Sequence, residues 1–232
     1  MWRQPLALRD VAASRLVGWL KRFGVELPMS IEGQISFALQ AGIPISSIGE
    51  ARAYELDGIV TSPKLVVAGV TLLDLSASLR YRDGVMDWPV LRFRLPPRGE
   101  STESASITGS GRAQLAPVGD FEIRADVANF DFAMIPELSG APLPLSGSAS
   151  GRARVRVAKS DFANLASWSG DAAIATRAVK LPGLNSPSAE AAFRFAGDTL
   201  NFERLRGVIN DIPLGLAGAV KLAADYRTLA LE

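Results

Sequence analysis

Leu75-Ser-Ala-Ser-Leu-Arg-Tyr-Arg-Asp-Gly84 returns 114 residues later as Ala189-Glu-Ala-Ala-Phe-Arg-Phe-Ala-Gly-Asp198. Both stretches alternate apolar and polar residues, which is the pattern of a β-strand with one buried and one exposed face. The next segment repeats at the same spacing of 114 residues. Met86-Asp-Trp88 and Leu91-Arg92 correspond to Leu200-Asn-Phe202 and Leu205-Arg206, with the same pattern of apolar and polar residues. A repeated β unit usually builds an array with an extended surface rather than a single catalytic pocket.

The repeat extends upstream and sets the expected domains. Leu27-Pro-Met-Ser-Ile-Glu-Gly33 resembles Leu143-Pro-Leu-Ser-Gly-Ser-Ala149, at a spacing of 116 residues. We therefore expect a first β-repeat unit over residues 1–138, with an N-terminal amphipathic helix, and a second over residues 139–232. Residues 229–232 take the place of residues 121–124 in the first unit, so we expect the second unit to be truncated and the chain to be a fragment.

Period-two alternation covers most of the remaining chain. It is clear in residues 31–39, 105–115, 119–128, 145–157 and 214–222. Asp83-Gly84 and Gly197-Asp198 fall between alternating runs, and both residue types tolerate positive φ, which predicts two hairpin turns.

The alternation slips by one residue at the same place in each unit. Met86, Trp88 and Val90 give way to Leu91, Phe93 and Leu95, and Leu200 and Phe202 give way to Leu205, Gly207 and Ile209. One extra residue in a strand is a β-bulge, which bends the sheet. The predicted fold is mainly β, with repeated antiparallel strands in an elongated, curled, groove- or taco-like sheet and a few short capping helices.

Helical patterns are confined to three short segments. Apolar residues from Leu8 to Phe23 recur at helical spacing before Gly24, and residues 132–138 and 161–168 are shorter candidates. The first helix is basic, so it fits either the surface of a membrane or the end of a sheet. Its counterpart before the second Leu-Pro strand favours packing on the sheet.

The composition excludes several classes of function. The 232 residues are 48% hydrophobic with a formal net charge of +1, which gives no bulk electrostatic reason to expect nucleic acid as a partner. There is no cysteine and no histidine, so thiolate nucleophiles, histidine triads and the usual zinc sites are excluded. No phosphate-binding glycine motif occurs. We expect no enzyme activity, no catalytic or metal-binding residues, and no cofactor.

The charged residues fit an exposed face better than a site. The carboxylates that lie close in sequence are Asp83 with Asp87, Asp120 with Glu122 and Asp126, and Asp198 with Glu203. They occupy turns or the polar positions of alternating strands, which predicts a solvated surface. Arg152, Arg154, Arg156 and Lys159 fit a phosphate or lipid-headgroup contact, but pairing with acids on neighbouring strands is the preferred interpretation.

The apolar strand faces need a cover, because large exposed apolar patches are rare in soluble monomers. A second sheet, the same sheet curled over itself, or an apolar ligand would each serve. The recurring bulge favours curling, and small residues between large ones leave space for a groove. The candidate groove residues are Ile35, Phe37, Leu75, Leu79, Trp88, Phe93, Phe193, Phe195, Phe202 and Leu216.

The order of these elements resembles the AsmA-like superfamily of bacterial envelope proteins, which includes the TamB-type translocation and assembly proteins. The resemblance lies in a short helix before Leu-Pro-[Met/Leu]-Ser, the Val179 to Leu184 stretch, the Ala191 to Gly207 stretch, and Leu216-Ala-Gly-Ala-Val-Lys-Leu222. It covers about Leu8 to Glu232.

The resemblance implies a location and a function. Members are curled β-sheets in the periplasm, membrane-associated through an inner-membrane anchor, which would lie in a segment outside this chain. Their apolar groove is associated with phospholipid transport to the outer membrane, and some members assist outer-membrane biogenesis. The implied partners are a phospholipid or another apolar lipid, and other envelope proteins. The family brings no catalytic residues.

Two alternatives stay open. A structural or adhesive β-repeat scaffold would have a dry, closed core and no ligand. A carbohydrate-active enzyme would need two carboxylates about 5–10 Å apart across a cleft, and no pattern in the chain indicates such a pair.

Overall fold

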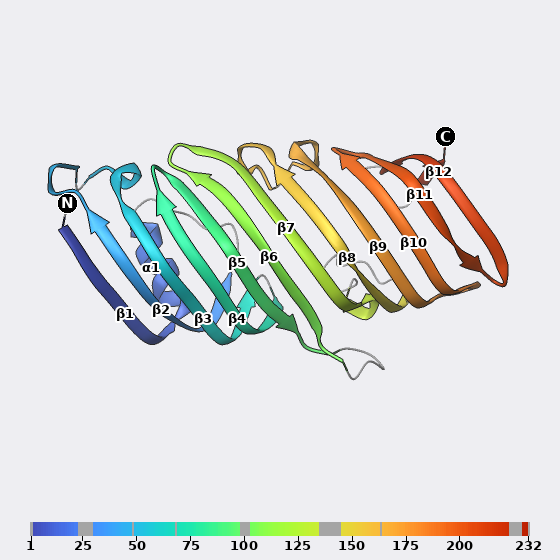
Figure 1. Cartoon of the computed structure of the whole chain (residues 1–232), viewed down its shortest axis with the longest axis horizontal. Coiled ribbons are helices and arrows are strands. Elements are labelled where there is room, and N and C mark those ends of the chain that lie inside the picture. The colour runs from blue at the N-terminus through green and yellow to red at the C-terminus, as the bar shows by residue number, and fades with distance from the viewer. Residues whose placement is uncertain are drawn as a thin grey trace. The chain divides into compact units, whose positions relative to one another are not determined.

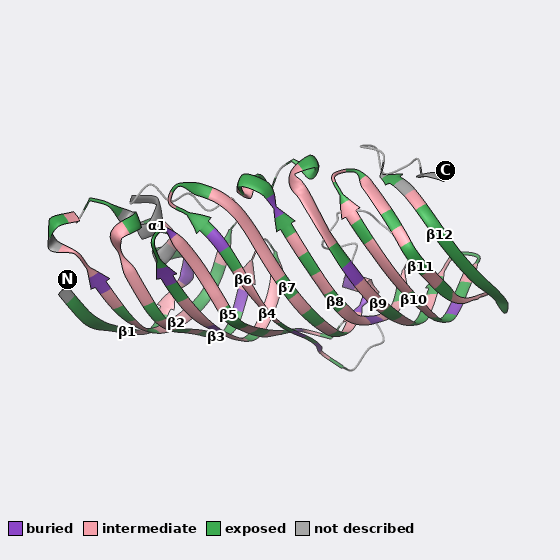
Figure 2. Cartoon of the chain, turned by 45° about the horizontal axis from the view of Figure 1, so that its top comes forward, coloured by how far each residue is buried: buried purple, intermediate pink, exposed green. Residues whose placement is uncertain are grey.

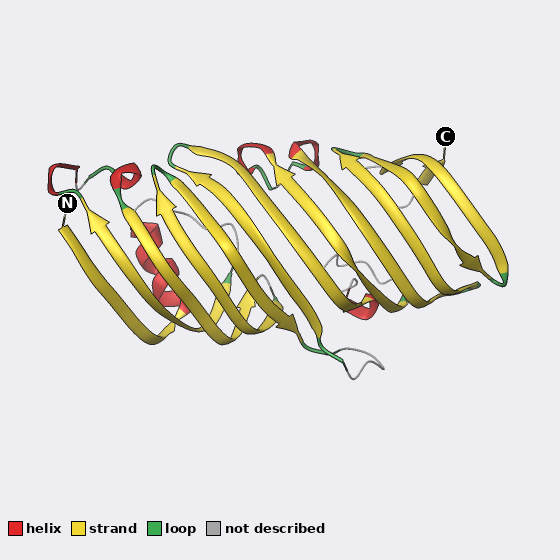
Figure 3. Ribbon diagram, viewed as in Figure 1, coloured by secondary structure: helices red, strands yellow, loops and turns green. Residues whose placement is uncertain are grey.

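The computed structural model describes residues 2–22, 30–47, 49–67, 69–97, 103–134, 145–162, 164–222 and 229–231. The protein is mainly β, with antiparallel strands in an open sheet and only a few short helices (Figure 1, Figure 3). The predicted fold class is confirmed. The strands follow chain order because each hairpin places the next strand beside the last.

The chain forms two compact units, and each is described separately. Unit 1 comprises Met1–Pro96 with Ser106–Val118, and unit 2 comprises Pro97–Ala105 with Gly119–Glu232. The predicted division of the repeat between residues 138 and 139 stays a prediction, since compactness and sequence repetition are different criteria.

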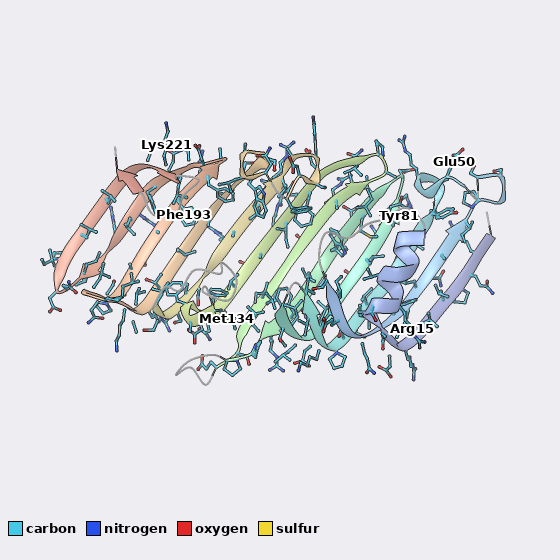
Figure 4. All side chains as sticks on the ribbon, turned by 180° about the vertical axis from the view of Figure 1, so that it is seen from behind. Arg15, Glu50, Tyr81, Met134, Phe193 and Lys221 are labelled. Carbon is cyan, nitrogen blue, oxygen red and sulfur yellow. The ribbon has the colours of Figure 1, made fainter. Side chains whose placement is uncertain are left out.

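Unit 1 contains most of the helical structure of the described residues. Its elements are β1 (Trp2–Ala12), α1 (Ala13–Arg22), β2 (Ile31–Ile43), the 3-10 helices η1 (Ile45–Ser47) and η2 (Ala51–Ala53), β3 (Glu55–Val67), β4 (Val70–Arg82), β5 (Val85–Leu95) and β6 (Ala105–Leu115). Helix α1 packs on β1 and β2, and Ala13 at its first position is 1% exposed. Packing on the sheet, the preferred interpretation of this helix, is confirmed (Figure 4).

Unit 2 repeats the strand pattern with shorter helices. Its elements are β7 (Val118–Asp131), η3 (Phe132–Met134), β8 (Ser146–Val157), η4 (Ala158–Ser160), η5 (Leu165–Ser167), β9 (Trp168–Leu181), β10 (Leu184–Ala196), β11 (Thr199–Ile209), β12 (Ile212–Leu222) and β13 (Leu229–Leu231). Residue 118 is counted with unit 1 by compactness, although it begins β7.

The predicted repeat is present in the structure. Strands β10 and β11 begin and end 114 residues after β4 and β5. Gly33 in β2 and Gly147 in β8, also 114 residues apart, share an unusual backbone conformation with φ of +120° and +115°. The two Leu-Pro dipeptides lie outside the described residues, but inside these strands the spacing is 114 rather than the expected 116.

Both predicted hairpins and both predicted bulges are confirmed. Arg82 pairs with Val85 and Ala196 with Thr199, which leaves two residues in each turn. Along β5 the partners of Ser78 and Arg80 are Val90 and Asp87, so β5 carries one extra residue. Strand β11 has the equivalent extra residue between Phe202 and Leu205 relative to β12.

Several further bulges were not predicted, and two of them, in β1 and β7, are each stabilised by a serine. Asp10 in β1 and Asn129 in β7 have positive φ, and their backbone N–H groups donate to Ser36 Oγ and Ser150 Oγ, both at 3.0 Å. Ser36 and Ser150 are 114 residues apart. The hydroxyl replaces the ladder hydrogen bond that the bulge removes, which lowers the cost of an unpaired N–H.

The helix predictions need correction at two places, the first candidate and the third. Residues 8–12 are strand, because Leu6 and Leu8 pair with Leu39 and Phe37 of β2, so the helix begins at Ala13. Residues 132–134 of the second candidate form a helical turn, and its remaining residues, 135–138, lie outside the described residues. The third candidate is wrong: η5 is a single turn, and Trp168 already begins β9.

Candidate functional site

Each unit has one apolar sheet face, and strand register defines it because directly paired residues point to the same side. In unit 1 one row of paired residues crosses five strands. It consists of Leu8, Phe37, Val60, Ala77 and Leu91. Every residue in the row is apolar, and all are half-buried except Ala77, which is 7% exposed.

The neighbouring rows of unit 1 continue the apolar face. Leu39 pairs with Gly58, and Gly58 pairs with Leu79. The next row contains Leu56, Tyr81 and Met86. Burial raises the pKa of the Tyr81 phenol above its usual value. The residues of these two rows are half-buried, and Tyr81 is buried; Figure 2 colours the strands by this burial.

Unit 2 carries the equivalent apolar face across six strands. One row consists of Ala125, Ala153, Ala172, Phe193, Phe202 and Gly218. The adjacent row consists of Ile123, Val155, Gly170, Phe195 and Leu200. Neither row contains a polar side chain, which makes this face suitable for contact with hydrocarbon.

The aromatic rings on this face lie beside glycine and alanine. The ring centroids of Phe193 and Phe202 are 5.8 Å apart, within the range of favourable aromatic pairs. The ring of Phe195 lies against Gly170, and a Cβ at that glycine would also collide with the carbonyl oxygen of Arg154. Large side chains thus lie next to small ones on this face, which leaves an uneven apolar surface.

An aromatic cluster closes one end of the apolar face of unit 2. Phe162, in the connection between β8 and β9, packs edge-on against Phe121 at 5.2 Å and Trp168 at 6.2 Å between centroids. Val157, which pairs with both Phe121 and Trp168, is fully buried. The Trp168 indole N–H donates to the Phe162 carbonyl oxygen at 3.3 Å, which fixes this corner.

The opposite face of unit 2 is polar and carries several ion pairs. Glu122 Oε1 accepts from both Arg124 and Arg154, which would otherwise repel each other because they are directly paired. Asp120 accepts from Arg156 and from the Lys159 backbone N–H. The preferred interpretation of the arginine ladder, pairing with acids on neighbouring strands, is confirmed for Arg154 and Arg156.

These contacts lower the pKa values of both carboxyl groups. The Lys159 N–H and the Arg156 guanidinium hold the pKa of Asp120 below its usual value. Partial burial raises the pKa of Glu122, but Arg124 and Arg154 outweigh it, so the net shift is downward. Both groups are therefore ionised at neutral pH, as partners of arginine.

The other carboxylates singled out from the sequence also lie outside the apolar faces. Asp87 pairs with Arg112 and Glu203 with Arg194, at 3.6 and 2.7 Å. Asp83 lies in a hairpin turn at φ of +52°. Among the described residues no group of three or more acids is arranged to hold a metal ion.

The structure places each candidate groove residue on a strand. In unit 1 these are Ile35 and Phe37 on β2, Leu75 and Leu79 on β4, and Trp88 and Phe93 on β5. In unit 2 they are Phe193 and Phe195 on β10, Phe202 on β11, and Leu216 on β12. Phe193 lies directly opposite Phe202, and Leu216, opposite Leu205, is 43% exposed, while the other nine are half-buried.

Three large, buried apolar residues of unit 1 are not among the candidate groove residues. Leu65, Leu95 and Ile107 are between 5% and 8% exposed. Leu65 lies in a continuous apolar run without alternation, so its face could not be assigned. Ser62 beside it is 2% exposed, and its hydroxyl donates to the Gln34 carbonyl oxygen at 2.6 Å.

Comparison with known proteins identifies no relative: no family model, no curated protein and no solved structure matches the chain. Within the described part of the chain, no helix is long and apolar enough to cross a bilayer.

Proposed function

We propose that the apolar faces of the two units accommodate the acyl chains of a phospholipid or another apolar lipid, without catalysis. The protein would serve as a segment of an AsmA-like cell-envelope protein in phospholipid transport or outer-membrane assembly. The row from Ala125 to Gly218 carries the proposal, because along it six strands in succession present an apolar residue to the same side.

Acyl chains would bind this face because the protein itself covers it only in part. Among the described residues, every helix other than α1 has three residues, too few to cover six strands. Phe193, Phe195 and Phe202 are only half-buried, although Phe193 packs on Phe202 and Phe195 lies against Gly170. Each acyl CH₂ group that such a surface removes from water contributes about 0.8 kcal/mol.

A dry structural scaffold is the alternative, and one observation favours it. The cluster of Phe121, Phe162 and Trp168 buries Val157 completely without any ligand. If the rest of the face closed in the same way, the strands would form a filled core with no room for lipid.

The test is lipid content in matched variants. We expect an organic extract of the purified protein to contain phospholipid at a stoichiometric level by mass spectrometry. The double variant Phe37→Glu with Phe193→Glu should lose it, because charge on the apolar face is costly beside hydrocarbon. The control, Gln40→Glu with Ala192→Glu, adds the same charge on the opposite face and should retain lipid.

A further inference from the structure

The polar face of unit 1 carries an apolar stripe that the lipid proposal does not use. Directly paired residues Ala7, Ala38, Ile59, Ser78 and Val90 cross β1 to β5 on this face. Ile59 is 53% and Val90 43% exposed, and both are among the large apolar residues most open to solvent. A shallow hollow of about 620 Å³ lies over the stripe, lined in part by Ala7, Ala38, Ile59 and Ser78.

Unit 2 provides an internal comparison for this stripe. At the positions 114 residues later, Arg152 replaces Ala38 and Arg204 replaces Val90. Arg152 is exposed on the polar face, paired with Asp126 and Ala173 across the neighbouring strands. The same strand framework therefore accepts arginine here, so folding does not require the apolar residues of unit 1.

The stripe is flanked by charges that are segregated by strand. Strand β3 carries the acids Glu55 and Asp57, and β4 carries the bases Arg80 and Arg82. Within the chain, Arg80 Nε lies 3.2 Å from Asp57 Oδ2, and Arg82 Nε lies 3.7 Å from Glu55 Oε1. Asp57, Arg80 and Arg82 all keep more than half of their side-chain surface exposed, which leaves room for a second partner.

We propose that this face binds a second copy of the chain about a two-fold axis that runs parallel to the strands, between β3 and β4. Such an axis places β3 of one copy over β4 of the other, with the same row of residues facing itself. Asp57 then meets Arg80 of the second copy, and Glu55 meets its Arg82. The contact is self-complementary, as a two-fold interface requires.

The same axis also matches the apolar stripe. Ile59 of one copy faces Ser78 of the other, and Val90 faces Ala38, so each large side chain lies over a small one. The Ser78 hydroxyl accepts a hydrogen bond from the Val90 backbone N–H at 3.0 Å. This polar group therefore already has a partner when Ile59 packs over it. Val90 of the second copy enters the hollow beside Ala38.

The available area suits a sheet-on-sheet dimer. The axis places β2 over β5 and β1 over β6, and these six strands, spaced about 4.8 Å apart over about nine residues each, present roughly 850 Å² per copy. A stable interface buries about 800 Å² on each partner, and aligned sheets pack about 10 Å apart. This dimer uses the face opposite to the lipid-binding proposal and does not depend on it.

The test is the mass of the protein in solution, by sedimentation velocity at about 5–100 μM. We expect the original protein to be a dimer. Its dissociation constant should rise at least about tenfold in Ala38→Arg, which introduces the residue that unit 2 has at the equivalent position. It should rise as much in Asp57→Arg, because the new arginine would face Arg80 of the second copy. The double variant Asp57→Arg with Arg80→Asp should return to within about threefold of the original protein, because it reverses both partners. Ala192→Arg, on the polar face of unit 2, is the control and should leave the dimer unchanged.

Circular dichroism is the check that each variant folds. If Ala38→Arg does not fold, Asp57→Arg alone is used to test the dimer. A protein that stays monomeric at 100 μM would overturn the proposal. So would a dimer that is indifferent to Ala38→Arg and Asp57→Arg, or one that the double charge reversal does not restore.

Discussion

The ring of Phe195 lies against the α-carbon of Gly170 on the neighbouring strand, so closely that a Cβ on the glycine would be 2.8 Å from Phe195 Cζ. The two residues are directly paired across β9 and β10. The Phe195 ring thus occupies the space that a side chain at position 170 would need. This close packing shapes the apolar face of unit 2.

Gly170→Ala should therefore destabilise the protein although its backbone is ordinary. The new Cβ would collide with the Arg154 carbonyl oxygen, which belongs to the ladder and cannot move freely. We expect a loss of about 1–3 kcal/mol in the free energy of unfolding, measured by urea denaturation. Gly215→Ala is the matched control, since nothing lies within 4 Å of its Cβ position. Equal stability of both variants would contradict the account.

Ser150→Ala should reveal the cost of the bulge in β7. The Ser150 hydroxyl is the acceptor for the Asn129 N–H, and its loss leaves that partly buried donor unsatisfied. We expect the free energy of unfolding to fall by about 1–2 kcal/mol. Ser146→Ala, on the same strand and exposed, should change it by less than about 0.5 kcal/mol. A neutral Ser150→Ala would mean that water satisfies the bulge equally well.

Phe162→Ala should loosen the closed end of unit 2. Its ring contacts Phe121 and Trp168, and together they bury Val157. We expect a loss of about 1–3 kcal/mol and a weaker near-ultraviolet circular dichroism signal from Trp168. Leu165→Ala in the same connection is the control, because Leu165 is 46% exposed and should matter little. An unchanged spectrum in Phe162→Ala would show that the cluster does not persist in solution.

Asp120 should contribute to the acid sensitivity of the fold. Its pKa is lower in the folded protein than its usual 3.8, because the Lys159 N–H and Arg156 stabilise the carboxylate. A lowered folded pKa means that the stabilisation is present above about pH 4 and is lost as the pH falls through the folded value. The melting temperatures of Asp120→Asn and the original protein should therefore differ at pH 6, and the difference should shrink as the pH falls below the usual pKa of 3.8. A difference in melting temperature that stays constant as the pH falls would contradict a stabilising role for the Asp120 carboxylate.

Alternation and repetition were sufficient to predict most of the strands, the two hairpins and the recurring bulge, but not β1, β3 or β9. The bulge in β5 is visible because Trp88 and Leu91 break a period of two. The bulges at Asp10 and Asn129 are not visible, because a residue of either type occurs equally well in a regular polar position. Their serine partners lie 26 and 21 residues away, so no local pattern links them.

The N-terminal error has a similar cause. Leu8 and Val11 fit a helix as well as a strand over so short a stretch. Pairing with β2 decides between them, and that pairing is a long-range contact that local periodicity does not contain. The large apolar residues of the candidate site were likewise identifiable by size, whereas the role of Gly170 emerges only when Phe195 is placed beside it.

The measurement that tests the lipid proposal most directly is the mass-spectrometric analysis of an organic extract of the purified protein, beside the Phe37→Glu with Phe193→Glu variant. The account predicts stoichiometric phospholipid from the original protein and from the Gln40→Glu with Ala192→Glu control, and its loss from the variant. A lipid-free extract from folded, monodisperse protein, or equal lipid in all three, would contradict it and favour a dry β scaffold.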